Sequence, residues 1–403
     1  MRKLKLLFTL LISLLAAQIH AQNVNNLTRN VPEGGVLSSG MLPNLVAYTS
    51  GGEKISLRDL CKDKYTLIVT GCLTCPEFRR AHPTIEAIAA DYKRKGVQFY
   101  FVYKTLRHPE LEGYVEAQKI SERLIMVEHA KKKLGGEIEW IVDEMDNNIA
   151  TALRAGSRSG YLISPKGEII NAWGSPQEQA MRSALTRVVG APSKVTRVEE
   201  LNLPAFERVA RTKNIDSDIS IMRTDGLTIL KTTPQNPDDT YYVKMRAEAD
   251  ESLMSTGKGR MALGFFPDPV YDAHWNNLTP AMKYVLELPE GVTASPHEAT
   301  AKPGKGDSDS EPRQFWVDIK GAKPGDVMKI TYHYYACAPG MCEAFSHTYT
   351  IELTQEQKGA RTYGFNRAGR MNSGNARSGN NTQRQRSSGQ YQQNQRSNQR
   401  SRY

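Results

Sequence analysis

The residues best able to do chemistry are two cysteines spaced as Cys72-Leu-Thr-Cys75 and followed at once by Pro76. Two cysteines with two residues between them can close a disulfide across one turn, so the pair can cycle between dithiol and disulfide. The spacing therefore predicts a redox-active pair. A structural disulfide and half of a zinc site are the alternatives, but no second CxxC or nearby His pair completes a zinc ligand set.

The elements around this pair place it on a turn between a strand and a helix. The apolar run 65–70 precedes the cysteines, and the segment 77–92 after them has a helical pattern. A helix begun at Pro76 points backbone N–H groups and a partial positive charge at the turn, which favours thiolate over thiol. Both sulfurs lie within this field, so helix geometry does not choose between them. We expect Cys72 to attack and Cys75 to resolve.

The first residues predict export. Three basic residues precede the apolar run 6–17, and Ala21 supplies a small residue at a cleavage edge. This pattern is that of a secretory signal peptide over residues 1–21, and it is too short for a stable membrane anchor. We therefore expect a periplasmic or secreted protein in an oxidising space, where a cysteine pair persists as a disulfide unless something reduces it.

The formal net charge of +10 comes from the two ends of the chain. The tail 359–403 holds nine arginines and no Asp or Glu, and the signal region is also basic. The residues between are close to neutral, so composition does not support nucleic-acid binding by the folded core. The tail is rich in Gln, Asn, Ser and Gly and lacks apolar residues, so we expect a disordered extension. An electrostatic tether to an acidic surface is the alternative.

The rest of the chain divides into two predicted domains joined by a linker at 191–217. Residues 40–190 alternate strand and helix patterns and predict an α/β layer structure. Residues 218–356 show short alternating segments separated by Pro, Gly and Asn, which predict an antiparallel β-sandwich. In the first domain we expect strands at 67–70, 98–103 and 138–142, a hairpin at 160–171, and helices at 84–95, 116–134 and 177–189.

The remaining cysteines and some polar residues are assigned less specific roles. Cys337 and Cys342 are separated by four residues that include Pro339-Gly340, so the chain can turn and a disulfide can close, whether exchange-active or structural. Cys61 is expected to be a small buried residue. His82 could modulate the thiols or be solvated. We expect no cofactor and no metal site.

One more polar segment follows the predicted strand 138–142. Asp143, Asp146 and Asn147 stand at the end of this strand, where polar side chains usually cap or brace the turn into the next helix. We therefore expect a structural role for them and no part in the chemistry.

Several ordered motifs in residues 65–190 carry a family resemblance. Thr precedes Cys75, Pro follows it and Phe comes two residues later; Tyr103 is followed five residues on by His108-Pro109; and 143–147 reads Asp-Glu-Met-Asp-Asn. This order resembles the iodothyronine deiodinase and peroxiredoxin-like group. The resemblance implies a thioredoxin-like fold, with Cys75 at the reactive position and His108 as a proton donor.

The chain also departs from that group. Residues 104–106 read Lys-Thr-Leu where the group has acidic residues, and Leu73 replaces a cysteine while Cys72 completes a CxxC. Residues 158–160 read Arg-Ser-Gly where thioredoxins keep a cis-proline. Because a disulfide exchange needs two thiols and this chain provides them, we expect a thiol–disulfide oxidoreductase with a redox partner protein or a thiol/disulfide substrate. A dehalogenase or thiol peroxidase acting through Cys75, and a non-enzymatic binding module, are the alternatives.

The second domain carries a further resemblance. Cys337 and Cys342 lie between two strand patterns, Trp275 stands in a short strand pattern, and 286–289 reads Leu-Glu-Leu-Pro. These features resemble the N-terminal immunoglobulin-like domain of the disulfide interchange protein DsbD. The resemblance implies an exchangeable second pair, possible site residues Cys337 and Cys342, and a relay of thiol–disulfide exchange between the two domains.

Overall fold

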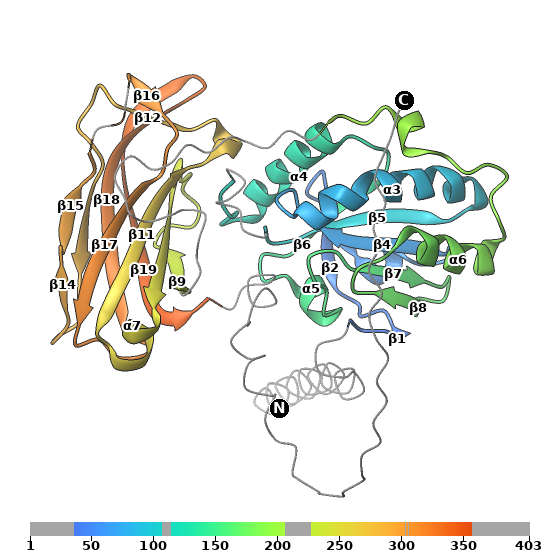
Figure 1. The fold of residues 1–403 in the computed structure, drawn as a ribbon, viewed down its shortest axis with the longest axis horizontal. Coiled ribbons are helices and arrows are strands. Elements are labelled where there is room, and N and C mark those ends of the chain that lie inside the picture. Colours follow the sequence, from blue (N-terminus) through green and yellow to red (C-terminus); the bar gives the residue numbers. More distant parts are fainter. Residues whose placement is uncertain (1–35, 107–113, 206–226, 303, 305, 357–403) are drawn as a thin grey trace, which may run out of the picture. The chain divides into compact units, whose positions relative to one another are not determined.

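The computed structural model describes residues 36–106, 114–205, 227–302, 304 and 306–356. These residues form an α/β region (36–205) and a β region (227–356), and each has its own sheet (Figure 1). The expected signal peptide, His108 and the arginine-rich tail lie outside the described residues. In the described part of the chain, no helix combines the length and the apolar character needed to cross a membrane.

The α/β region is built on one eight-stranded sheet with the order β1-β8-β7-β4-β5-β6-β2-β3. Strands β4, β5 and β6 run parallel to one another, whereas β7 is antiparallel to β4 and pairs with β8 as a hairpin. The strands are β1 (Gly40–Met41), β2 (Val46–Thr49), β3 (Lys54–Ser56), β4 (Thr66–Gly71), β5 (Gln98–Tyr103), β6 (Glu139–Asp143), β7 (Gly160–Ile163) and β8 (Glu168–Trp173).

Helices connect these strands and cover the sheet (Figure 1). Because β4 and β5 are parallel, the chain must cross over between them, and helix α3 makes this crossover. The helices are α2 (Leu57–Leu60), α3 (Pro76–Tyr92), α4 (Ile120–Leu134), α5 (Asn148–Ala152) and α6 (Glu178–Val189), with short 3-10 turns η1 (Lys93–Lys95) and η3 (Val198–Leu201).

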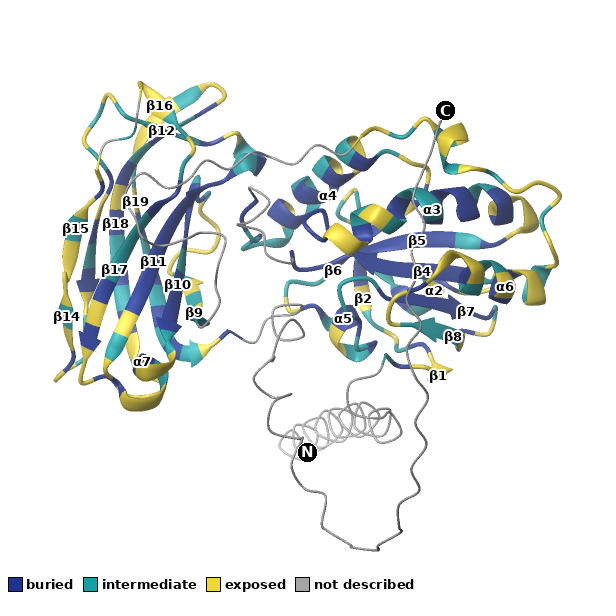
Figure 2. Cartoon of the chain, in the orientation of Figure 1, coloured by how far each residue is buried: buried dark blue, intermediate teal, exposed yellow. Residues whose placement is uncertain are grey.

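The period-two alternation of the strands divides the core into two layers. Leu67 and Val69 of β4 pack on one face of the sheet with residues of α3, α4 and α6. Ile68, between them, packs on the other face with residues of α2 and α5. Figure 2 shows the central strands buried along most of their length. Burial on both faces is the environment that the near-continuous apolar runs predicted.

One of these helices begins as predicted and another does not. Helix α3 begins at Pro76, as the helical pattern over 77–92 predicted and earlier than the narrower range 84–95, because Pro76 suits the first helical position and the Cys75 sulfur accepts the N–H of Phe78. Helix α4 begins at Ile120, after the predicted start at 116. The Glu116 carboxylate accepts the N–H of Leu106, which holds the segment before α4 in an irregular conformation.

The β region is an eleven-stranded sheet in which every strand pair is antiparallel. The path through it is β14-β17-β11-β10-β9-β19-β18-β12-β16, with β13 beside β18 and β15 beside β13. The strands are β9 (Leu227–Pro234), β10 (Val243–Asp250), β11 (Gly259–Pro267), β12 (His274–Asn276), β13 (Lys283–Glu287), β14 (Thr293–Ser295), β15 (Glu298–Thr300), β16 (Ser308–Asp309), β17 (Arg313–Lys320), β18 (Val327–Ala338) and β19 (Met341–Gln355).

One apolar core unites the two ends of this sheet. Inward-facing residues of β10, β11 and β17 share a cluster with those of β13, β18 and β19. In β18 the buried residues alternate strictly with more exposed ones, as expected of a strand with one face on a core: Met328, Ile330, Tyr332, Tyr334 and Ala336 are buried. A short helix, α7 (Glu251–Thr256), and a 3-10 turn, η4 (Pro269–Tyr271), complete the region.

Candidate active site

The predicted strand–turn–helix around the cysteines is confirmed. Strand β4 ends at Gly71, Cys75 is the N-cap of α3, and Pro76 is its first residue. The Cys75 N–H donates to the carbonyl of Cys72 at 3.2 Å, so the two residues face each other across one tight turn. The sequence thus places both cysteines at the carboxyl end of a central strand.

Both sulfurs are present as thiols and both are fully buried. The Cys72 sulfur lies 3.6 Å from the hydroxyl of Thr74. The Cys75 sulfur accepts the N–H of Phe78 at 3.5 Å, which is one of the N–H groups that a helix leaves unpaired at its first turn. The positive end of α3 therefore acts most directly on Cys75, and a partner can reach either sulfur only after the turn opens locally.

Close packing beneath the turn fixes its position. The Phe78 ring packs edge-on against Phe101 and Trp140, with centroids 5.1 and 5.5 Å apart. A Cβ atom built on Gly71 would lie 2.3 Å from the Phe78 ring, so only glycine fits there without a shift of that ring. This contact locks the start of α3 onto the end of β4.

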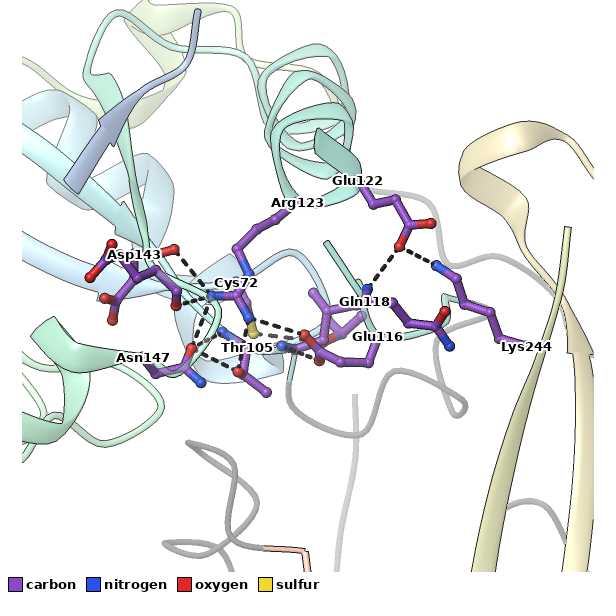
Figure 3. A network of polar contacts seen from close by, with 12 residues as sticks. Cys72, Thr105, Glu116, Gln118, Glu122, Arg123, Asp143, Asn147 and Lys244 are labelled. Atoms are coloured by element: carbon purple, nitrogen blue, oxygen red, sulfur yellow. Dashed lines mark hydrogen bonds and ion pairs between the residues drawn. The ribbon is translucent and has the colours of Figure 1, made fainter. Parts of the chain in front are cut away.

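Two polar side chains near Cys72 were not assigned a role from sequence. Burial raises the pKa of Tyr103 well above its usual value, and the charges of Cys72 and Glu116 raise it further. Figure 3 shows Cys72 and Glu116 in one cluster of polar side chains. Tyr103 is in register with Gly71, the residue before Cys72, which explains its place.

A buried arginine organises the loops at this edge of the sheet. Arg123 of α4 donates to the side chains of Asn147 (3.2 Å) and Thr105 (3.2 Å), and it forms an ion pair with Glu116 at 3.5 Å. Figure 3 shows its guanidinium group among these residues, with Cys72 in the same cluster. Arg123 also donates to the carbonyl oxygens of residues 143 and 144.

The predicted bracing role of Asp143 and Asn147 is confirmed. The Asp143 carboxylate accepts the N–H groups of Ile149 and Ala150, both at 2.9 Å, and so caps the start of α5. Asn147 has a φ of 58°, and its side-chain oxygen accepts the N–H and the hydroxyl of Thr105. Asparagine tolerates this left-handed conformation better than most residues do.

His82 is buried. Of the two alternatives predicted for it, a solvated position is therefore wrong. It is 1% exposed, its ring packs edge-on against Phe78 and tilted against Phe101, and its Nε2 atom is 3.6 Å from Glu86. Burial lowers its pKa to about 4, so the ring is neutral at physiological pH. Cys61 is also buried, as predicted, and burial raises its pKa to about 12.

The loop opposite the cysteines contains Arg158-Ser-Gly160 in place of a cis-proline. The Ser159 N–H donates to the hydroxyl of Thr70 at 3.1 Å, and the Thr70 N–H donates to the carbonyl of Ser159 at 2.8 Å. This reciprocal pair joins the loop to β4 two residues before Cys72. The predicted proton donor His108 lies outside the described residues, so the structure gives it no position.

The second cysteine pair forms a disulfide in the β region. Cys337 is the second-last residue of β18, Cys342 is the second residue of β19, and the two residues are directly opposite each other. The chain turns at Pro339-Gly340, where Gly340 has a φ of 82° that favours glycine. Across the residues that the structure covers, no group of three or more His, Cys, Asp or Glu side chains could hold a metal ion.

Comparisons with known proteins give only distant likenesses. No protein-family model and no curated protein matches this chain. A solved thiol:disulfide interchange protein from Bacteroides sp. is 16% identical, covering 39% of this chain and 93% of that protein, with a TM-score of 0.31.

Two further solved structures resemble the chain to a similar degree. The thioredoxin domain of a thiol-disulfide oxidoreductase from Bacteroides vulgatus is 17% identical over 38% of this chain and 97% of its own length, with a TM-score of 0.30. A thiol-disulfide oxidoreductase from Bacteroides fragilis is 15% identical over 37% of this chain and 99% of its own, with a TM-score of 0.29. Likenesses at these identities and TM-scores carry no argument about the site, so its chemistry is argued from its own geometry alone.

Proposed function

We propose that the protein is a thiol–disulfide oxidoreductase that cycles Cys72 and Cys75 between dithiol and disulfide. The observation that carries this proposal is the position of both thiols on one tight turn at the N-terminus of α3. A helix N-terminus stabilises thiolate, and the turn keeps the second sulfur within reach of the first. The α/β region would then be a thioredoxin-like domain, in agreement with its strand order β8-β7-β4-β5 and its crossover helix α3.

The reaction runs in two exchanges. In the first, the Cys72 thiolate attacks a substrate disulfide, forms a mixed disulfide and expels one substrate thiolate. In the second, Cys75 attacks the Cys72 sulfur, closes the Cys72–Cys75 disulfide and releases the other substrate thiol. A reducing partner protein must return the pair to the dithiol.

The finer parts of the proposal concern export and the second domain. We propose that residues 1–21 direct the chain to the periplasm or outside the cell, and that the β region is an immunoglobulin-like domain whose Cys337–Cys342 pair also exchanges. Thiol–disulfide exchange between the two pairs would form a relay. The order of strand, cysteine, tight turn, cysteine and strand in β18 and β19 supports the second pair.

The test is a redox titration of the mature chain followed by alkylation and peptide mass measurement. If Cys72 and Cys75 act as proposed, they form one pair that titrates between about −120 and −270 mV. Cys72→Ser should abolish turnover of a disulfide substrate, and Cys75→Ser should trap the mixed disulfide. Cys61→Ala is the matched control and should keep full turnover. A Cys72–Cys75 bond that never forms, or a fully active Cys72→Ser variant, would overturn the proposal.

A thiol peroxidase or reductive dehalogenase acting through Cys75 is the second candidate. The observation that favours it is the N–H of Phe78 on the Cys75 sulfur, because this contact stabilises a thiolate at Cys75. In that case Cys75→Ser is inactive and Cys72→Ser is only slowed. The same pair of variants therefore separates the two candidates. The remaining possibility, a non-enzymatic binding module, requires that no cysteine variant change any turnover.

A further inference from the structure

The Cys337–Cys342 disulfide lies on a face of the β region that also carries residues of β12. His274 of β12 is directly opposite Cys337, and Cys337 is directly opposite Cys342. Directly opposite residues of antiparallel strands project from the same face, with Cβ atoms about 4.5–5.5 Å apart. The three side chains therefore lie in a row across three neighbouring strands.

This row is on the outer face of the sheet. Trp275 and Ala336, which point the other way, are 3% and 0% exposed and belong to the core. Cys342 is exposed, and Cys337 and His274 are partly exposed. A thiol in solution can therefore approach Cys342 first, in contrast to the buried sulfurs of the α/β region.

Each cysteine has a polar residue of β12 near it, Asn276 by a hydrogen bond to Cys342 and His274 by its register opposite Cys337. The side-chain amide of Asn276 donates to the Cys342 sulfur at 3.3 Å. The Nδ1 atom of His274 lies 3.2 Å from the carbonyl oxygen of Asp272. When Nδ1 donates its proton to that carbonyl, Nε2 is the nitrogen that gains and loses a proton, on the side chain opposite Cys337.

The other charged residues near His274 are not placed to exchange a proton with Cys337. Asp272 precedes β12 and contacts the ring through its carbonyl oxygen. Asp309 of β16 is opposite Trp275, on the core-facing side of β12, and is bound there by Arg313 at 2.8 Å. Glu343 of β19 is one residue beyond Cys342 and projects from the opposite side of its strand. His274 is thus the titratable side chain directly across from Cys337.

We propose that His274 and Asn276 make Cys337–Cys342 an exchange site for a dithiol, with one assistant for each sulfur. This rests on the part of the proposed function that assigns exchange to the second pair. A thiolate of the incoming dithiol attacks the exposed Cys342 sulfur, the Cys337–Cys342 bond breaks, and Cys337 leaves with a proton from His274. The second thiol of the incoming molecule then attacks the other sulfur of that molecule, which is bonded to Cys342, and closes the disulfide of the incoming molecule. Cys342 leaves as a thiolate that Asn276 stabilises.

The two steps balance in atoms and electrons. The incoming dithiol is oxidised to a disulfide, and Cys337–Cys342 is reduced to two thiols. In the reverse direction, His274 takes the proton of Cys337 as that thiol attacks a mixed disulfide at Cys342. The site therefore suits the exposed dithiol or disulfide of a partner protein, whichever direction the electrons flow.

The test uses the full chain with Cys61→Ala, Cys72→Ser and Cys75→Ser, so that only the second pair can react. Dithiothreitol is the probe, and acid-quenched alkylation with mass measurement gives the rate of reduction from pH 5.5 to 8.5. Rates are divided by the concentration of dithiothreitol thiolate. In the parent protein this corrected rate should rise as the pH falls, because the proposed step takes a proton from His274, and His274→Gln should make it flat.

Asn276 is tested by the alkylation of reduced Cys342. Asn276→Leu should slow its alkylation at pH 7 by about fivefold, the effect of one lost hydrogen bond, and Asn276→Asp should slow it further because a carboxylate opposes the thiolate. His333→Gln is the matched control. His333 is an exposed histidine on β18, the strand that also carries Cys337, and it is opposite Ser346. It should leave both measurements unchanged.

The outcomes separate this inference from the proposal on which it rests. If dithiothreitol cannot reduce the pair in the folded protein, exchange at the second pair fails and this inference fails with it. If the pair is reduced, but His274→Gln and Asn276→Leu behave like His333→Gln, the second pair exchanges without these residues and this inference alone is wrong. Neither result touches the assignment of Cys72 and Cys75.

Discussion

At the scale of single residues, the five cysteines occupy three different environments. Cys72 and Cys75 are buried thiols on a turn that a helix N-terminus stabilises. Cys61 is a buried thiol in an apolar cluster, and burial raises its pKa to about 12. Cys337 and Cys342 form a disulfide on a partly exposed hairpin. The five cysteines therefore differ in burial and in bonding although they are one residue type.

A first prediction concerns Arg123. Replacing it by Met should destabilise the α/β region by about 3 kcal/mol, because Glu116 and the side-chain oxygen of Asn147 lose a buried donor. Hydrogen exchange of the amides of β5 and β6 measures the change in this region alone. Arg94→Met, at an exposed position in η1, is the control and should change stability by less than about 0.5 kcal/mol. Equal exchange rates in both variants would contradict the prediction.

At the scale of elements, the junction of β4 and α3 holds the candidate active site. The strand ends and the helix begins within five residues, and Phe78 closes the junction by packing against Gly71, Phe101 and Trp140. Because this packing involves four elements, α3, β4, β5 and β6, a change of volume here moves the start of α3 and with it the cap on Cys75.

A second prediction follows for Gly71. In Gly71→Ala the new methyl group would be 2.3 Å from the Phe78 ring, so the ring must shift at a cost of about 1–3 kcal/mol. Thermal or urea unfolding measures the loss, and faster alkylation of Cys75 reports the displaced cap. Gly51→Ala adds the same methyl group 3.6 Å from its nearest neighbour and should be tolerated. A Gly71→Ala variant as stable as Gly51→Ala would argue against tight packing at the junction.

A third prediction concerns acid stability and His82 in α3. Its pKa is 6.5 in the absence of burial and about 4 in the folded protein, so the unfolded chain binds more protons between these values. Stability should therefore fall as the pH drops from 6.5 to 4, by up to about 3 kcal/mol. Burial raises the pKa of the neighbouring Glu86, which contributes in the opposite direction and offsets part of this loss.

The variant His82→Leu isolates the contribution of this ring. It should show a shallower loss of unfolding free energy between pH 6.5 and 4 than the parent protein. His297→Gln, at an exposed position of the β region, should keep the slope of the parent. A slope that is the same in all three proteins would show that His82 is not the group that titrates.

At the scale of the whole molecule, each region has its own core and its own cysteine pair. The α/β core encloses the Cys72–Cys75 turn. In the β region, Cys337 projects from the face of β18 that points away from the core. The pairs can therefore be altered one at a time, which allows their contributions to stability and to turnover to be separated.

A fourth prediction uses this separation. Removing the second pair by Cys337→Ala and Cys342→Ala should destabilise the β region by about 2 kcal/mol, as expected for a short loop that the disulfide closes in the unfolded chain. Turnover of a small disulfide substrate by Cys72 and Cys75 should stay unchanged. Region-specific hydrogen exchange and a substrate assay measure the two effects. A parallel loss of turnover would instead indicate that the pairs depend on each other.

The amino-acid sequence by itself determined the local structure that carries Cys72 and Cys75. The apolar run, Cys72, Cys75 and Pro76 predicted a strand, a turn and a helix, and the structure confirms all three. The change from helical to alternating patterns also predicted the two regions and their fold classes. These features follow from neighbours close in the chain, whose spacing matches the periods of helix and strand.

Only the tertiary structure decided which distant residues surround each cysteine pair. Strand register places Tyr103 beside the Cys72 turn, and helix packing brings Arg123 to Glu116. In the β region, the pairing of β12 with β18 sets His274 opposite Cys337. A single sequence carries no periodic signal for such pairings, because they depend on how strands align and helices pack across long separations in the chain.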